Sequence, residues 1–151
     1  MASRNPGPAS IPFEDPSAAA LRALRGHLEL EEVEAARGVY DQSRRKIAGW
    51  QPPPADWLVL ISSLIRYEFW DDAIRVLEAY LAEVESPSPR ARLKLAQLLI
   101  QKQARPARAL RVLGEIPRGS LPSNLEPIRE QLTRQAERMQ DEGPLELGDE
   151  V

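Results

Sequence analysis

Apolar side chains recur along the chain at helical spacing, in segments separated by prolines, glycines and polar residues. Asp15 and Pro16 suit the cap and the first position of a helix. Leu21, Leu24 and Leu28 then fall on one face of it. Further helices are expected at 31–47, 54–69, 71–84, 90–102 and 106–115, and a last one begins at 123. The pattern therefore predicts an all-α protein.

The helix starts and apolar faces differ between these segments. Ser88 is expected to cap the fifth helix, with Pro89 in its first turn, and Ser123 and Glu126 have capping-box spacing at the last one. The helix at 54–69 is apolar on nearly all sides, which predicts neighbours on more than one side. The last helix has a single apolar stripe, made of Leu125, Ile128, Leu132, Ala136 and Met139.

A five-residue motif recurs at nearly constant spacing. It reads AIRVL at 73–77 and ALRVL at 109–113, 36 positions apart, and a looser copy, ARGVY, lies at 36–40. Residues 17–118 accordingly form three helix pairs joined by short loops, and the repeated alanine marks a close approach of two helices. A pair cannot bury its apolar face alone. The sequence therefore predicts an α-solenoid of three stacked helical hairpins plus a C-terminal capping helix.

The segment 57–87 resembles a tetratricopeptide repeat (TPR). Its identities with the pattern of that repeat are Trp57, Leu60, Ala73 and Pro87. In the next pair, Ala96 stands at the small position of the repeat and Ala109 one residue late. The resemblance implies a TPR-like helical-repeat protein that acts as an adaptor or scaffold, holding a peptide or helix of a partner protein in a concave groove.

The two ends of the chain differ from its middle. Residues 1–14 are rich in Pro, Ser and Gly and are expected to form a flexible tail. We assign residues 15–140 to the TPR-like domain and residues 141–151 to an acidic C-terminal tail. Because the sequence shows neither a signal peptide nor an apolar run long enough for a membrane span, we expect a cytoplasmic protein.

Charge is unevenly distributed along the chain. Residues 1–85 carry 9 basic and 14 acidic groups (−5), residues 86–119 carry 8 and 1 (+7), and residues 120–151 carry 3 and 8 (−5). The basic middle segment is either a solvated, arginine-rich helix pair neutralised by its acidic flanks or a binding surface for an anionic partner.

The sequence contains few residues in patterns typical of catalytic or metal-binding sites. His27 is the one histidine and has no second ligand at metal spacing, and there are no cysteines. Asp71 and Asp72 are adjacent, so on a helix they point in different directions and suit the positive end of the helix dipole instead. The three tryptophans are expected to be packing anchors. We therefore expect no enzyme activity, no cofactor and no metal.

The candidate binding surface follows from the resemblance, because the first helix of each pair lines the concave side in repeats of this kind. Residues outside the core pattern on these helices would face the groove and give it an apolar floor and basic walls. A partner with acidic and apolar groups would suit it, unless the chain's own last helix or N-terminal tail fills it. The residues are Arg22 and Arg25 on the first helix, Leu58, Ser62, Ile65 and Arg66 on the second, and Arg90, Lys94, Gln97 and Gln101 on the third.

Arg90 and Lys94 are similar in position to the basic pair of the carboxylate-clamp members of the family, which bind acidic C-terminal tails of chaperones. The second inner helix has Val59 and Ser62 in place of the asparagines that complete such a clamp. The sequence therefore departs from the clamp pattern at these positions.

The alternative function is RNA binding. A pentatricopeptide repeat is also a helical hairpin, and LISSLI at 60–65 resembles part of one. Such repeats read bases with polar side chains of the inner helix, whereas Leu58 and Ile65 are apolar and the chain carries a net charge of −3. The sequence favours protein binding over nucleic acid and leaves the partner and the oligomeric state open.

Overall fold

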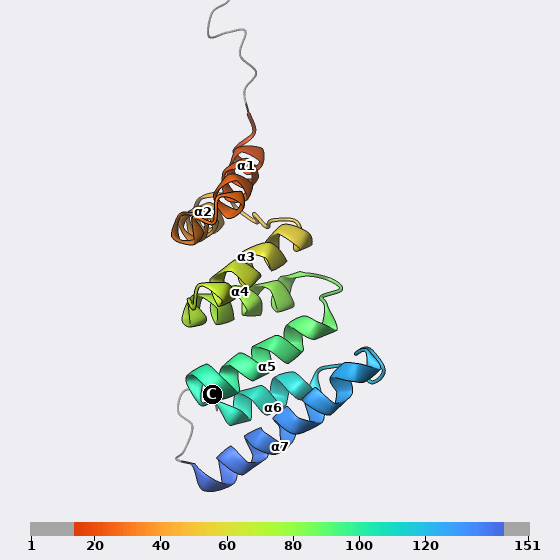
Figure 1. The fold of residues 1–151 in the computed structure, drawn as a ribbon. Helices are drawn as coiled ribbons and strands as arrows, with labels where there is room; N and C mark the ends of the chain where they lie inside the picture. Colours follow the sequence, from red (N-terminus) through yellow and green to blue (C-terminus); the bar gives the residue numbers. More distant parts are fainter. Residues whose placement is uncertain (1–13, 144–151) are drawn as a thin grey trace, which may run out of the picture. The chain divides into compact units, whose positions relative to one another are not determined.

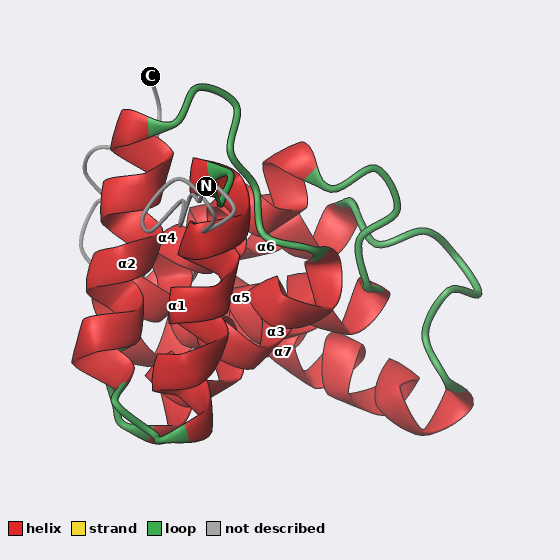
Figure 2. Ribbon diagram, turned by 90° about the horizontal axis from the view of Figure 1, so that it is seen from above, coloured by secondary structure: helices red, strands yellow, loops and turns green. Residues whose placement is uncertain are grey.

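The computed structural model describes residues 14–143, and within them the backbone forms helices and loops without a strand (Figure 2). The prediction of an all-α protein is therefore confirmed for this part of the chain, with helix ends within about three residues of those expected. The helices are α1 (Pro16–Glu29), α2 (Val33–Lys46), α3 (Pro54–Arg66), α4 (Trp70–Glu83), α5 (Pro89–Gln103), α6 (Pro106–Gly114), the short 3₁₀ helix η2 (Ser123–Leu125) and α7 (Glu126–Glu142).

Several helices begin at a proline, as expected. The expected side-chain caps are present at some helix starts and absent at others. The Asp15 carboxylate accepts hydrogen bonds from the backbone N–H groups of Ser17 (3.0 Å) and Ala18 (3.3 Å), as expected of a cap. Ser88 is the N-cap residue of α5 and Pro89 is the first residue of the helix, as expected, but the Ser88 side chain makes no capping bond, and the N–H of Ala91 donates to the Ser88 carbonyl.

The start of α7 also differs from the expected capping box. Leu125 donates its N–H to the Pro122 carbonyl, so the chain enters α7 through the 3₁₀ turn of η2, and the Glu126 carboxylate binds Arg129 at 2.9 Å. In the expected apolar stripe, Leu132 and Ala136 are buried, but Ile128 is 39% exposed. The helix continues to Glu142, past the boundary expected at residue 140.

The described residues divide into two compact units, one ending at Ser63 and the other beginning at Leu64, within α3. In the first unit, α1 packs on α2 across a short connection. In the second unit, each helix packs on the next, from α4 through α5 and α6 to α7, and α7 also contacts α5 (Figure 1). The N-terminal tail expected at 1–14 and the acidic tail expected at 141–151 lie mostly outside the described residues.

An aromatic cluster anchors the first unit. The indole N–H of Trp57 donates to the Tyr40 hydroxyl at 3.2 Å, and the Trp50 ring meets the Tyr40 ring edge-on. Arg44 lies over the rings of Tyr40 and Trp57, 5.6 and 5.4 Å from their centroids, and donates to the Trp50 carbonyl at 2.9 Å. Trp50 and Trp57 are buried as expected of packing anchors, whereas Trp70 is partly exposed beneath the ammonium of Lys102.

The sequence repeat is matched by a repeat in the backbone. At each of three turns, between α1 and α2, α3 and α4, and α5 and α6, one residue adopts the left-handed conformation, and none of the three is glycine. Each precedes the alanine of the repeated motif by five residues, and all three alanines are fully buried. The turn residues are Glu31, Glu68 and Ala104, with φ of 58°, 65° and 51°, and the alanines are Ala36, Ala73 and Ala109.

The turn between α5 and α6 offers a test of this geometry. A side chain in the left-handed region costs about 1–2 kcal/mol, and glycine avoids that strain but has more freedom in the unfolded chain. Ala104→Gly is therefore expected to raise the free energy of unfolding by about 0.5–1 kcal/mol, measured by urea unfolding.

The matched control is Ala79→Gly in the interior of α4, which should lower the same free energy by about 1 kcal/mol. Equal effects of the two variants would show that the conformation at Ala104 carries no strain.

Candidate interaction surface

The helices α1, α3 and α5 each present an exposed stripe with the same spacing, i, i+4, i+7 and i+11, which places its members on one face of a helix. All members are exposed except Gln97, which is partly exposed. The stripes are Ala18, Arg22, Arg25 and Glu29 on α1, Ala55, Val59, Ser62 and Arg66 on α3, and Arg90, Lys94, Gln97 and Gln101 on α5.

The stripe on α5 contains the four residues expected on that helix. The other faces of α5 are buried along most of its length, so these side chains form its main outward surface. The Lys94 ammonium donates to the Gln97 side-chain carbonyl at 3.0 Å. Neither Arg90 nor Lys94 forms an ion pair with a carboxylate of residues 14–143. Within residues 14–143, these two exposed cations therefore have no carboxylate partner.

Several other arginines of the second unit are held by acidic side chains. Arg108 pairs with Glu78, and Arg92 lies 3.9 Å from Glu115. Glu78 lies in the acidic segment before residue 86, so the Arg108–Glu78 pair is of the kind that the neutralisation interpretation expected, whereas Glu115 is the acidic residue of the segment 86–119 itself. The charges of Arg90 and Lys94 are not neutralised in this way.

The two arginines expected on α1 already have partners in the first unit. Arg22 forms two hydrogen bonds with Glu14, and Arg25 binds Asp56 through Nε (2.8 Å) and a terminal nitrogen (2.9 Å). The hydrogen bonds from Arg25 hold the pKa of the Asp56 carboxyl below its usual value. A partner that binds either arginine must compete with these carboxylates.

On α3, the structure exposes a different apolar residue from those expected. Ser62 and Arg66 are exposed, but Leu58 and Ile65 are half-buried on the flank of the stripe. Val59 is 49% exposed and lies within the stripe. Its position could have been found from the spacing shared by Ala55, Ser62 and Arg66.

The polar groups considered for chemistry have structural partners. His27 Nδ1 lies 2.7 Å from the Glu32 carboxylate, Asp71 accepts from Gln103, and Asp72 pairs with Arg75. Among residues 14–143, no three side chains of the metal-binding types lie together as a possible ion site. The helices of this region are also too short or too polar to cross a membrane.

Comparison with known proteins identifies no relative of this chain. No protein-family model matches the chain, and no curated protein and no solved structure matches it. The candidate surface is therefore defined by the residues and geometry of the chain alone.

Proposed function

We propose that the chain is a non-catalytic protein-interaction adaptor, built of three TPR-like helical hairpins that stack as a solenoid. It binds an acidic and partly apolar segment of a partner protein through the stripe on α5. The observation that carries the proposal is the pair of exposed cations, Arg90 and Lys94, without a carboxylate partner in residues 14–143.

The repeat geometry supports the first part of this proposal. Each of three turns contains a left-handed residue five positions before a fully buried alanine. Equivalent hairpins would share such a feature. Stacked repeats bury one continuous core and leave one face of each inner helix for binding.

The side chains of the α5 stripe suit a polypeptide with carboxylates. Arginine and lysine attract carboxylates and steer their approach, while the amides of Gln97 and Gln101 can donate to and accept from a peptide backbone. Ile65, half-buried on α3 and part of the second unit, is proposed to supply an apolar contact. RNA would also be attracted by the cations, but the stripe on α5 contains no aromatic side chain for base stacking.

The test is the charge reversal Arg90→Glu with Lys94→Glu. A partner recovered with the parent protein should bind this variant at least about tenfold more weakly at low salt, because two attractive charges become repulsive. Ile65→Asp should also weaken binding, and its effect should persist at high salt because an unpaired charge is then buried. Affinities are measured by isothermal titration at two salt concentrations.

The matched control is Arg45→Glu with Lys46→Glu, which reverses two exposed cations at the end of α2. It changes the net charge equally and should leave the affinity within about twofold. Equal weakening by the two charge reversals would exclude the α5 stripe as the site. Binding of labelled RNA that is lost only in the Arg90 and Lys94 variant would favour the RNA-binding alternative.

A further inference from the structure

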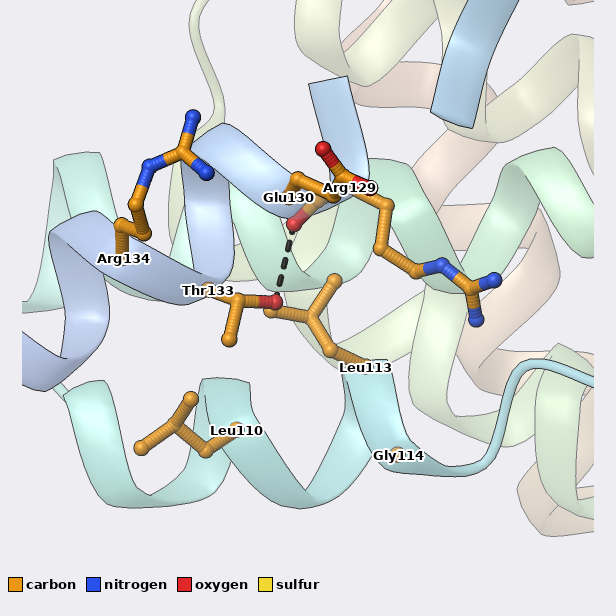
Figure 3. Close-up of a pocket in the computed structure, with 7 residues that line it drawn as sticks. All are labelled: Leu110, Leu113, Gly114, Arg129, Glu130, Thr133 and Arg134. Carbon is orange, nitrogen blue, oxygen red and sulfur yellow. Dashed lines mark hydrogen bonds between the residues drawn. The ribbon is translucent and has the colours of Figure 1, made fainter. Parts of the chain in front are cut away.

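The hydroxyl side chains of the second unit differ in whether the fold already uses them. The Thr133 hydroxyl, in the wall of a groove between α6 and α7, donates to the Arg129 carbonyl at 2.9 Å (Figure 3). The Ser120 hydroxyl donates to the Pro117 carbonyl at 2.6 Å. Ser86, in the loop between α4 and α5, is exposed, and its hydroxyl has no hydrogen-bond partner within residues 14–143. Another protein can therefore reach this hydroxyl without breaking a bond of the fold.

Ser86 belongs to the segment SPSP at 86–89, which contains two Ser-Pro dipeptides. No other serine or threonine of the chain is followed directly by proline. One class of protein kinases selects a serine or threonine by the proline that follows it. The two dipeptides are therefore the places in this chain that a kinase of that class would recognise.

The two serines of this segment differ in how firmly the fold holds them. Ser88 is half-buried, directly precedes α5, and donates its N–H to the Tyr80 hydroxyl at 3.0 Å. Ser86 is exposed in the non-helical residues between α4 and α5. A kinase binds its substrate as an extended segment, so Ser86 can enter the kinase cleft with less local unfolding than Ser88.

We propose that Ser86 is a phosphorylation site for a proline-directed protein kinase and that its phosphate regulates the α5 stripe. The Ser86 Oγ attacks the γ-phosphorus of a nucleoside triphosphate held by the kinase. An Oγ–P bond forms, the bond from this phosphorus to the oxygen of the β-phosphate breaks, and a nucleoside diphosphate leaves. The hydroxyl proton passes to the catalytic carboxylate of the kinase.

The phosphate acts on the cations that follow it in the chain. A phosphoserine carries a charge of about −1.5 to −2 at neutral pH. Arg90 lies four residues after Ser86, a distance of at most about 14 Å along the backbone. Neither Arg90 nor Lys94 has a carboxylate partner within residues 14–143, so both attract the phosphate, and an acidic partner has to compete with it. This regulatory part of the proposal rests on the proposed function of the stripe.

Phosphate incorporation tests the first part without any binding partner. The full chain is incubated with a proline-directed kinase and ATP, and the modified residue is identified by mass spectrometry. Ser86→Ala is expected to lower the rate of incorporation at least about tenfold, whereas the matched control Ser88→Ala should leave it within about twofold. The protein isolated from its own cells should also carry phosphate on Ser86.

Incorporation at Ser88 that equals or exceeds incorporation at Ser86 would show that the accessibility of Ser86 does not decide the site. The absence of phosphate from Ser86 in the protein isolated from its own cells would likewise overturn the proposal. Neither outcome bears on the proposed function of the α5 stripe.

The regulatory part is tested with an acidic probe, a short synthetic peptide of alternating glutamate and leucine. Isothermal titration at low salt compares the phosphorylated and the unphosphorylated protein. Phosphorylation is expected to weaken binding of the probe at least about fivefold, and the difference should shrink at high salt. In Arg90→Gln with Lys94→Gln, binding should be weak and should no longer respond to phosphorylation.

A response to phosphorylation that persists in the double glutamine variant would be general charge repulsion, and regulation of the stripe would be wrong. If the probe bound the unphosphorylated parent and the double variant equally, the proposed function of the stripe would fail, and its regulation with it. Phosphorylation of Ser86 would then still stand on the incorporation measurement.

Discussion

Trp57→Ala is expected to lower the free energy of unfolding of the first unit by about 3–5 kcal/mol. The Trp57 side chain is fully buried, donates to Tyr40 and lies beneath Arg44. Its removal leaves a large cavity, breaks a buried hydrogen bond and takes away one of the two rings over which the Arg44 cation lies. Urea unfolding followed by far-ultraviolet circular dichroism measures the change without relying on tryptophan fluorescence.

Val59→Ala on the same helix is the control for this change. Val59 is 49% exposed, so its truncation is expected to change the free energy of unfolding by less than about 0.5 kcal/mol. If the two variants unfolded at the same urea concentration, the aromatic cluster would not be the anchor of the first unit.

Ala73→Leu and Ala109→Leu are each expected to destabilise the protein by about 1–3 kcal/mol. Both alanines are fully buried at the start of the second helix of a pair, and three added carbon atoms have no space there. The strain falls on neighbouring side chains, which must leave their preferred rotamers. The thermal and urea midpoints of each variant give the size of the effect.

Ala82→Leu is the matched control, because Ala82 lies on the exposed side of α4 and can accept a larger side chain. Its stability should stay within about 0.5 kcal/mol of the parent. A parent-like midpoint for both Ala73→Leu and Ala109→Leu would mean that the repeated alanine does not mark a close helix contact.

Helix positions could be predicted from the sequence because apolar periodicity and prolines are local signals. Pro54, Pro89 and Pro106 each stand at the first position of a helix, as expected. Ser88 takes the expected N-cap position without a side-chain bond. The capping box expected at Ser123 is wrong, because cap geometry depends on the path of the preceding loop. At Ser123 that path is a 3₁₀ turn, which spacing alone does not reveal.

The candidate surface was predictable to different degrees on different helices. On α5 the few polar residues fall on one stripe, so Arg90, Lys94, Gln97 and Gln101 could be identified. On α3 nearly every side is apolar, so hydrophobicity does not separate Val59 from Leu58 and Ile65, and only the spacing that Val59 shares with the exposed stripe identifies it. On α1 the Arg25–Asp56 pair joins residues 31 positions apart, which only the tertiary structure reveals.

The order of helix packing in the second unit bears on how it folds. Each helix from α4 to α7 packs on the next helix in the sequence, and the contact of α5 with α7 skips only one helix. Such packing gives a low contact order, and domains dominated by local contacts fold in microseconds to milliseconds. Closing short loops between neighbouring helices also loses little chain entropy. The second unit can therefore assemble helix by helix as the chain leaves the ribosome, without waiting for a distant segment to be synthesised.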